Sequence, residues 1–403
     1  MPLGPVLDVT EPSGIRSRKG VVAAEGAGVV RTLGVEEEML LVDIRNGRPR
    51  SVSGQLLVRA SHQPQEVAGV GVHGAVEGEF QQQQIETHTA PAADLDTLRG
   101  EVRRWRREAV DAARAASSSV AALGTSPLPV TPITAKSTRY AWMEDRYQLT
   151  AREHLTCGCH VHVSVESDDE GVAVLDRIRV WLPTLLAMSA NSPFWHGEDS
   201  GFASYRSQAM ARWPSSGPTD VFGSAEAYQR HVRDLVLTSV ILDEGMLYYD
   251  ARLATHYPTV EIRAADVCFT VEEAVVMAAL CRGLVETAAA EWAAGQEAPR
   301  VPTQLLRFAS WQAGREGLSG NLIDWDSGLP KPCWSVVDQL IGYVGPALEA
   351  AGDLGVVQEG LDRLREEGNG AIRQRAMLER TGQLVDVVAE SVRATAGHWD
   401  DPA

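Results

Sequence analysis

The chain has 403 residues, of which 44% are hydrophobic and 23% charged, a composition typical of a globular protein with a sizeable core. It carries 37 basic and 54 acidic side chains, and the net charge of −17 argues against nucleic acid and anionic membranes as partners. No apolar run approaches the roughly 20 residues of a membrane span, and five cysteines, an odd number, do not resemble a disulfide framework. We therefore expect a cytoplasmic protein with reduced cysteines.

The front of the chain differs from the rest. Residues 1–30 are rich in Gly, Pro and small side chains and show no sustained period, so we expect an extension that does not fold. Order is predicted to begin at 31–44, RTLGVEEEMLLVDI, where a β-like apolar run surrounds three carboxylates. A second extended stretch, 71–91, ends at a proline. Residues 31–398 are expected to form a single catalytic domain.

Helical and extended patterns alternate after residue 91. Apolar residues recur at steps of three and four from Leu95 to Val120, which predicts an amphipathic helix with Asp94 as its N-cap. The remaining predicted elements, in chain order, are a Pro-rich connector at 126–134, a strand at HVHVSV (160–165), helices at about 170–190 and 224–242, a strand at 258–267, a helix from Val271 to about Ala294, and a mostly helical remainder from there to 398.

Polar side chains recur at alternate positions of these strands. Residues i and i+2 of a strand share a face, so each of four strands presents one polar pair: Glu36 with Glu38, Glu86 with His88, His160 with His162, and Glu261 with Arg263. The positions between them are apolar or small, which favours an α+β fold with a mainly antiparallel sheet and helices packed on one side. Any one pair could simply lie on a solvated face, but four together indicate a site.

Such a face suits divalent cations and phosphate. Carboxylate oxygens are the ligands that Mg²⁺ prefers, and histidine can complete a Mg²⁺ or Mn²⁺ sphere. A guanidinium group neutralises phosphate or carboxylate oxygens. The sequence contains no Gly-Lys-Ser/Thr phosphate loop, and GVGVHG at 69–74 precedes a strand-like run instead of a helix, so it does not predict a dinucleotide site.

Several segments resemble the glutamate–cysteine ligase type 2 family, carboxylate–amine ligases of the glutamine-synthetase or guanido-kinase type of fold. They are GVEEE (34–38), QIETHTAP (84–91), CGCHVHV (157–163), SANSPFWHGEDSGFASYR (189–206), VEIRAAD (260–266) and RFASWQAGREGL (307–318). The resemblance implies an enzyme that uses ATP and Mg²⁺, or Mn²⁺, to activate glutamate through an acyl phosphate. It then joins the acid to cysteine or another amine.

The same resemblance suggests roles for individual residues. The implied metal ligands are Glu36, Glu38, Glu79, Glu86, His160 and Glu261. Arg206 and Arg263 are the implied clamps for phosphate or glutamate, because a guanidinium fork binds such groups at two points. His162, Asn191 and Gln84 are expected substrate contacts. Arg307, Trp311 and Arg315 lie on one face of a helix and are expected to hold the nucleotide.

Other interpretations of these residues stay open. Arg206 could pair with Glu198 or Asp199, Asn191 could belong to a helix cap, and the helix face of Arg307 could merely be solvated. The glutamines 81–84 could line an amine pocket, or their amides could form a ladder of hydrogen bonds across strands. The segment EVRRWRRE (101–108) is better interpreted as a solvated helix face than as a nucleic-acid patch.

Two cysteines and two histidines in TCGCHVHVSV (156–165) raise the question of a zinc site. In a strand the cysteines point to one face and the histidines to the other, so they cannot close one tetrahedron without a break at Gly158. We expect the sulfurs in the core and the imidazoles in the site.

Three function classes follow. The first is the ATP-dependent ligase, the second a metal- and ATP-dependent phosphotransferase acting on a carboxylate or guanidino group, and the third a binding protein that has lost catalysis. Small molecules are the expected partners, and a homo-oligomer is compatible with the sequence. Because every expected polar position is filled, the third class is the least favoured.

Overall fold

The computed structural model describes residues 30–60 and 75–397, and the predicted unfolded extension lies, apart from residue 30, outside this part. Seven strands form the central sheet: β1 (Leu33–Asp43), β2 (Ala75–Gly78), β3 (Gln84–His88), β4 (Ser118–Ala121), β5 (Gly158–Ser164), β8 (Ala251–Leu253) and β9 (Thr259–Asp266). Their order is β2-β3-β1-β5-β9-β8, β4 also pairs with β1, and every pairing is antiparallel. The predicted antiparallel sheet is confirmed.

Two small ribbons stand apart from this sheet. They are β6 (Phe194–Trp195) with β7 (Glu198–Asp199), and β10 (Asn321–Asp324) with β11 (Leu329–Pro332). The α-helices are α1 (Ser53–Ala60), α2 (Leu95–Ala115), α3 (Thr138–Tyr147), α4 (Leu149–Glu153), α5 (Asp168–Ile178), α6 (Leu182–Ser189), α7 (Tyr205–Met210), α8 (Ala225–Leu237), α9 (Val271–Ala293), α10 (Thr303–Glu316), α11 (Cys333–Ala351), α12 (Leu354–Glu367), α13 (Gly370–Thr381) and α14 (Leu384–Thr395).

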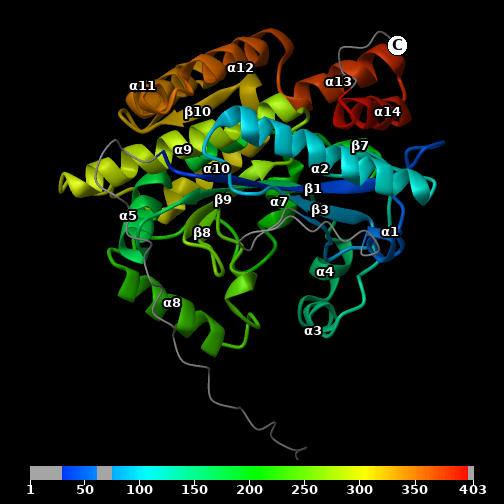
Figure 1. The fold of residues 1–403 in the computed structure, drawn as a ribbon, viewed down its shortest axis with the longest axis horizontal. Coiled ribbons are helices and arrows are strands. Elements are labelled where there is room, and N and C mark those ends of the chain that lie inside the picture. Colours follow the sequence, from blue (N-terminus) through cyan, green and yellow to red (C-terminus); the bar gives the residue numbers. More distant parts are fainter. Residues whose placement is uncertain (1–29, 61–74, 398–403) are drawn as a thin grey trace, which may run out of the picture.

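Helices cover one face of the sheet and leave the other for the site. α2 and α9 lie against that face, α11 and α12 pack on α9, and α14 contacts β4 (Figure 1). The apolar residues that alternate with the polar pairs, including Val35, Val161 and Ile262, are at most 2% exposed and belong to the core shared with α2 and α9. α3, α4 and α8 lie beyond the opposite face (Figure 1).

The predicted cap of α2 is confirmed, and α9 begins in a similar way. The Asp94 side chain accepts a hydrogen bond from the backbone N–H of Thr97 at 2.8 Å, and α2 begins at the next residue, Leu95. Thr270 caps the long α9 in the same way. The predicted helix at 170–190 is instead two helices, and it breaks just before Pro183, a residue suited to the first turn of a new helix.

The second extended stretch is a hairpin, not one strand. Glu77 of β2 pairs with Glu86 of β3, and Glu79 lies in the connection between them. The seven-residue spacing of Glu79 and Glu86 therefore spans a turn. β4, which follows α2, falls within a stretch that the periodicity had assigned to the helix.

The five cysteines are all buried and free. Cys157 and Cys159 are 0% exposed and pack in the two largest apolar cores, so the interpretation of these sulfurs as core residues is confirmed. Within residues 30–60 and 75–397, no helix is long and apolar enough to cross a membrane.

Candidate functional site

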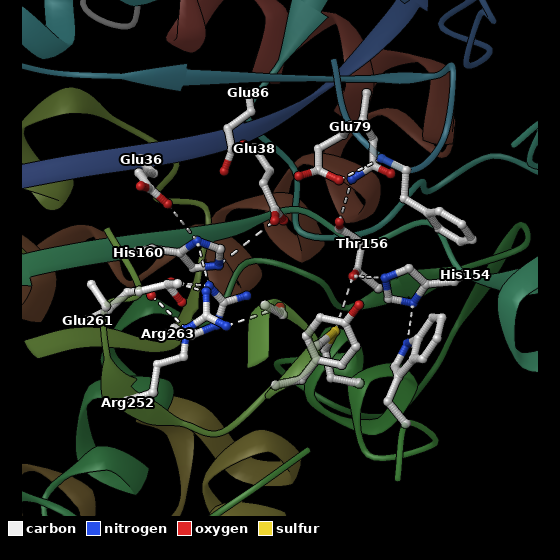
Figure 2. A pocket seen from close by; sticks show the side chains of 18 of the residues that line it. Glu36, Glu38, Glu79, Glu86, His154, Thr156, His160, Arg252, Glu261 and Arg263 are labelled. Atoms are coloured by element: carbon white, nitrogen blue, oxygen red, sulfur yellow. Dashed lines mark hydrogen bonds and ion pairs between the residues drawn. The ribbon is translucent and has the colours of Figure 1, made fainter. Parts of the chain in front are cut away.

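Carboxylates and imidazoles of four strands meet on the open face of the sheet. The strand register sets Glu36 of β1 between His88 of β3 and His160 of β5, and it sets Glu38 opposite Glu86. Figure 2 shows Glu36, Glu38 and Glu86 pointing from neighbouring strands toward His160. Because alternate residues share a face, these contacts follow directly from the pairing.

These side chains line a cavity of about 320 Å³. All six implied metal ligands contribute to its wall: Glu36, Glu38, Glu79, Glu86, His160 and Glu261. The expected substrate contacts His162 and Gln84 and both expected arginine clamps, Arg206 and Arg263, line the same cavity. The structure thus brings most of the predicted site together.

Three imidazoles surround the carboxylate of Glu36. Glu36 lies 3.3 Å from the Nδ1 of His160, 2.9 Å from the Nε2 of His162 and 3.3 Å from the Nδ1 of His88. Burial opposes ionisation of Glu36, but these three imidazoles hold the pKa of its carboxyl well below the usual range. Burial alone would also lower the pKa of His88, but hydrogen bonds to Glu36 and Glu86 raise it to about 11.

The geometry of this wall fits divalent cations. Ligand atoms lie within 4.8 Å of one another in three groups, namely Glu36, His160 and Glu261; Glu36, Glu86 and His88; and Glu38, Glu86 and His160. The Nε2 of His160 is buried, makes no hydrogen bond in the described part of the chain, and lies 3.8 Å from Glu38 Oε1. A buried nitrogen facing a carboxylate at that distance leaves room for an ion between them.

Glu79 lies apart from these three groups. It is drawn on the far side of Glu38 from His160 (Figure 2), and its carboxylate accepts the backbone N–H of Phe80 at 2.6 Å. Burial raises the pKa of Glu79 well above its usual range, and the charges of Glu86 and Glu38 raise it further. Of the six implied ligands it is the one with the least geometric support.

Arginines close the opposite side of the cavity. Glu261 of β9 accepts hydrogen bonds from Arg252 Nε at 2.7 Å and from the Nη1 of Arg263. Burial would raise the pKa of the Glu261 carboxyl, yet Arg263 and Arg252 hold it below the usual range. The two guanidinium groups and the carboxylate therefore fix one another beside His160, whose Nδ1 lies 3.4 Å from Arg263.

Arg206 approaches from α7 and is only 5% exposed. Its backbone N–H donates to Ser192 Oγ at 3.0 Å, and its Nη1 lies 3.8 Å from buried Asp266. A Cβ at Gly158 would lie 2.2 Å from the Nη2 of Arg206, so the guanidinium occupies space that only glycine leaves free. Asp199, the alternative partner considered for Arg206, pairs with Arg375 instead.

Comparison with known proteins decides the family. The model of glutamate–cysteine ligase family 2 matches residues 32–392. The chain belongs to this family. A protein provisionally named glutamate–cysteine ligase 2-1, from Streptomyces avermitilis, is 52% identical over 91% of this chain and 100% of its own length. The family resemblance seen in the sequence is confirmed, and the protein is a ligase that forms carbon–nitrogen bonds.

Two solved structures share the fold of this family member. The glutamate–cysteine ligase of Francisella tularensis in complex with AMP gives a TM-score of 0.65 at 12% identity and covers 93% of this chain and 90% of that one. The bifunctional glutathione synthetase from Pasteurella multocida gives 0.63 at 15% identity and covers 92% of this chain and 52% of that one. The predicted fold class is confirmed by these neighbours and by the antiparallel sheet.

Asn191 differs from its expected role in the ligase. Its side chain is 0% exposed and donates to the backbone carbonyls of Ala122 at 2.9 Å and Val267 at 2.8 Å, while Gln374 donates to its oxygen. The residue therefore joins the end of the sheet to α13 and presents no free atom to a substrate. We correct the substrate assignment of Asn191 to a packing role.

The side chains of glutamines 81–84 do not pair with one another across strands, and most of them do not face the cavity. Each amide nitrogen donates to a backbone carbonyl between residues 131 and 156, from Gln81 to Ala151, Gln82 to Thr134, Gln83 to Thr131 and Gln84 to Thr156. Only Gln84 also lines the cavity, and its Oε1 makes no hydrogen bond with any described residue.

A second cavity of about 470 Å³ adjoins the first. Arg206 and Arg263 line both cavities. Of the helix residues expected to hold a nucleotide, Arg307 and Trp311 line the second cavity, whereas Arg315 lies outside it with its guanidinium 5.7 Å from the ring centre of Phe202. The structure thus places two of those three residues together.

Several lining residues have no periodic signal in the sequence. They are Arg139, Tyr140, His154, Trp213 and Tyr248. Most come from short helices and connections, where alternation says nothing about direction. Arg252, which also lines the cavity, lies on the short strand β8, which the sequence analysis did not predict.

Proposed function

We propose that this ligase activates the γ-carboxylate of glutamate with ATP and couples it to cysteine or another amine through an acyl phosphate. The observation that carries the proposal is the convergence of acids, imidazoles and arginines from four strands on one cavity (Figure 2). An ATP-dependent ligation builds negative charge twice, first on phosphoryl oxygens and then on the acyl carbonyl. A site with cation ligands and fixed guanidinium groups stabilises both.

The metal ligands we propose are Glu36, Glu38, Glu86, His160 and Glu261, with Mg²⁺ as the ion and Mn²⁺ as an alternative. Bound there, the cations would neutralise phosphate oxygens and lower the barrier to phosphoryl transfer. Burial and the charge of Glu36 raise the pKa of Glu86, whereas the hydrogen bond with His88 lowers it. A cation bound nearby would stabilise the ionised form of Glu86.

Arginines hold the reacting groups in this mechanism. One oxygen of the glutamate side chain attacks the γ-phosphorus, the bond from that phosphorus to the bridging oxygen breaks, and ADP leaves. The amine nitrogen then attacks the acyl carbon, loses a proton, and expels phosphate. We assign the binding of phosphate or carboxylate oxygens in both steps to Arg263 and Arg206. The contact of Arg263 with Glu261 and the packing of Arg206 against Gly158 support this assignment.

The second cavity is the proposed nucleoside site. Trp311 is 53% exposed beside it, and an indole face there can stack on adenine, while Arg307 supplies positive charge. Since Arg206 and Arg263 line both cavities, a nucleotide in the second would place its phosphates at the shared wall. The AMP complex of the Francisella tularensis enzyme, a neighbour in fold, supports nucleotide use.

The test is an ADP-release assay with purified protein, ATP, Mg²⁺ and glutamate, run with and without each of the twenty amino acids and common polyamines. We expect ADP release that depends on one amine and an equal amount of amide product. ADP release that never depends on an amine would instead identify a phosphotransferase.

The metal wall is tested separately by Glu86→Gln and Glu261→Gln. Each replaces a carboxylate by an amide of the same shape, and we expect turnover to fall at least about a thousandfold while circular dichroism stays native. Glu226→Gln, at an exposed position of α8, is the matched control and should leave turnover unchanged. Wild-type rates in either site variant would remove the metal assignment.

A further inference from the structure

A groove of about 640 Å³ lies on the helix-covered side of the sheet. Its walls come from α2, the first turn of α9, α12, Arg373 of α13 and the end of α14, which surround one region in Figure 1. It shares no lining residue with the two cavities described above. Neither the family resemblance nor the proposed ligation uses it.

The groove is basic although the chain is acidic. Six of its lining residues are arginines: Arg103, Arg106, Arg107, Arg114, Arg363 and Arg373. Four are acids: Asp111, Glu272, Glu273 and Glu367. The excess of positive charge contrasts with the net charge of −17 for the whole chain.

Every one of these acids has an arginine partner within the groove. The pairs are Arg103 with Glu272, Arg114 with Asp111 at 3.0 Å, and Arg373 with both Glu273 at 3.1 Å and Glu367 at 3.0 Å. Arg106, on the floor of the groove, pairs with Glu37 of β1. The acids of the groove are thus already neutralised.

Two arginines remain without a partner. Arg107 of α2 and Arg363 of α12 are exposed, and both line the groove. Neither guanidinium group makes an ion pair or hydrogen bond with any residue in 30–60 or 75–397. Two guanidinium groups that face one hollow without counter-charge repel each other, and an anion between them would remove that repulsion.

We propose that this groove binds a small molecule with two or more phosphate or carboxylate groups, which bridges Arg107 and Arg363. Guanidinium forks suit both kinds of group, because each presents paired oxygens at the spacing of two N–H donors. Val110 and Leu364 supply apolar surface for the body of such a molecule. The groove volume suits a small ligand and not a polymer.

The floor of the groove connects to the sheet. Arg106 is 1% exposed and donates to Glu37 at 2.6 and 2.8 Å and to the carbonyl of Cys268 at 2.7 Å. Glu37 lies between the site residues Glu36 and Glu38 on β1. The guanidinium group of Arg106 is thus fully used inside the protein, and it leaves the binding of an anion to Arg107 and Arg363.

Calorimetric titration tests the binding, with pyrophosphate and citrate as separate probes of the phosphate and carboxylate classes, in EDTA. Removing one charged contact lowers the affinity for an anion by on the order of tenfold. We therefore expect the double variant Arg107→Gln with Arg363→Gln to bind the tighter of the two probes on the order of a hundredfold more weakly. Without the probe, its turnover should equal that of the wild type. Arg230→Gln with Arg300→Gln is the matched control, since it removes two exposed arginines that lie elsewhere and should change affinity less than about twofold.

Several results would overturn the proposal. They are no binding of either probe by the wild-type protein, equal affinity in the Arg107 and Arg363 double variant, or an equal loss in the control pair. Binding that disappears only with Arg263→Gln would place the anion at the metal wall instead. The double variant with lysine at both positions keeps the charge without the fork, and recovery of part of the affinity would support bidentate contact.

Discussion

Replacing Gly158 by alanine tests the arginine clamp with a single methyl group. The added Cβ would lie 2.2 Å from Arg206 Nη2 and 2.8 Å from its Cζ, so the guanidinium must retreat by about 1 Å or more to reach ordinary contact. Because the guanidinium group is the end of a flexible side chain, the loss in unfolding free energy should be about 1 kcal/mol. A displacement of about 1 Å at a positioning group can cost on the order of a hundredfold in rate, about 2.7 kcal/mol in activation free energy.

The assay is amine-dependent ADP release, with kcat and KM for glutamate and ATP measured separately. We expect Gly158→Ala to lower kcat/KM about a hundredfold with a melting temperature within a few degrees of wild type. The backbone N–H of residue 158 still donates to Glu38, so the metal wall keeps that contact. Gly100→Ala, where nothing lies within 4 Å of the new Cβ, is the control. Near-wild-type kcat/KM in a folded Gly158→Ala protein would refute the clamp.

Three further variants test other parts of the structure. Arg106→Gln leaves Glu37 buried without its partner, and urea unfolding should show a loss of about 3 to 5 kcal/mol; a loss below about 1 kcal/mol would contradict a buried ion pair. Burial lowers the pKa of His154 to about 4, below the ordinary 6.5, so the unfolded chain binds the extra proton and stability should fall as pH drops from about 6.5 to 4. His154→Gln should flatten that part of the stability profile, and an unchanged slope would argue against a buried neutral imidazole. Trp311→Ala should raise the KM for ATP about tenfold. Trp292 is also partly exposed but does not line the second cavity, so Trp292→Ala should leave this KM unchanged.

Alternation along strands was predictable because it depends on local backbone geometry alone. Glu36, Glu38, His160 and Glu261 face one cavity since each lies on the polar side of a strand whose other side is mainly apolar. The two-residue alternation does not say which strands are neighbours in the sheet. The order that sets β1 between β3 and β5 depends on contacts between residues far apart in the chain.

The direction of a side chain could not be predicted where tertiary packing sets it. Asn191 lies in the family segment 189–206, but its side chain is hydrogen-bonded to Ala122, Val267 and Gln374, from parts of the chain that no local pattern links to it. Arg106 belongs to a segment interpreted as a solvated face, yet it is buried because Glu37 reaches it from the sheet. Both cases are buried polar groups satisfied by distant partners.

Three consecutive glutamates on β1 divide between two tasks. Glu36 and Glu38 face the cavity, whereas Glu37 points to the helix layer and is neutralised by Arg106 of α2. A shift of β1 by one residue would put Glu37 in the cavity. It would also bury the carboxylates of Glu36 and Glu38 against apolar helices, without a positively charged partner for each. The buried ion pair therefore does more than satisfy one charge. It favours the register that presents Glu36 and Glu38 to the site, and it acts from the face of the sheet opposite the cavity.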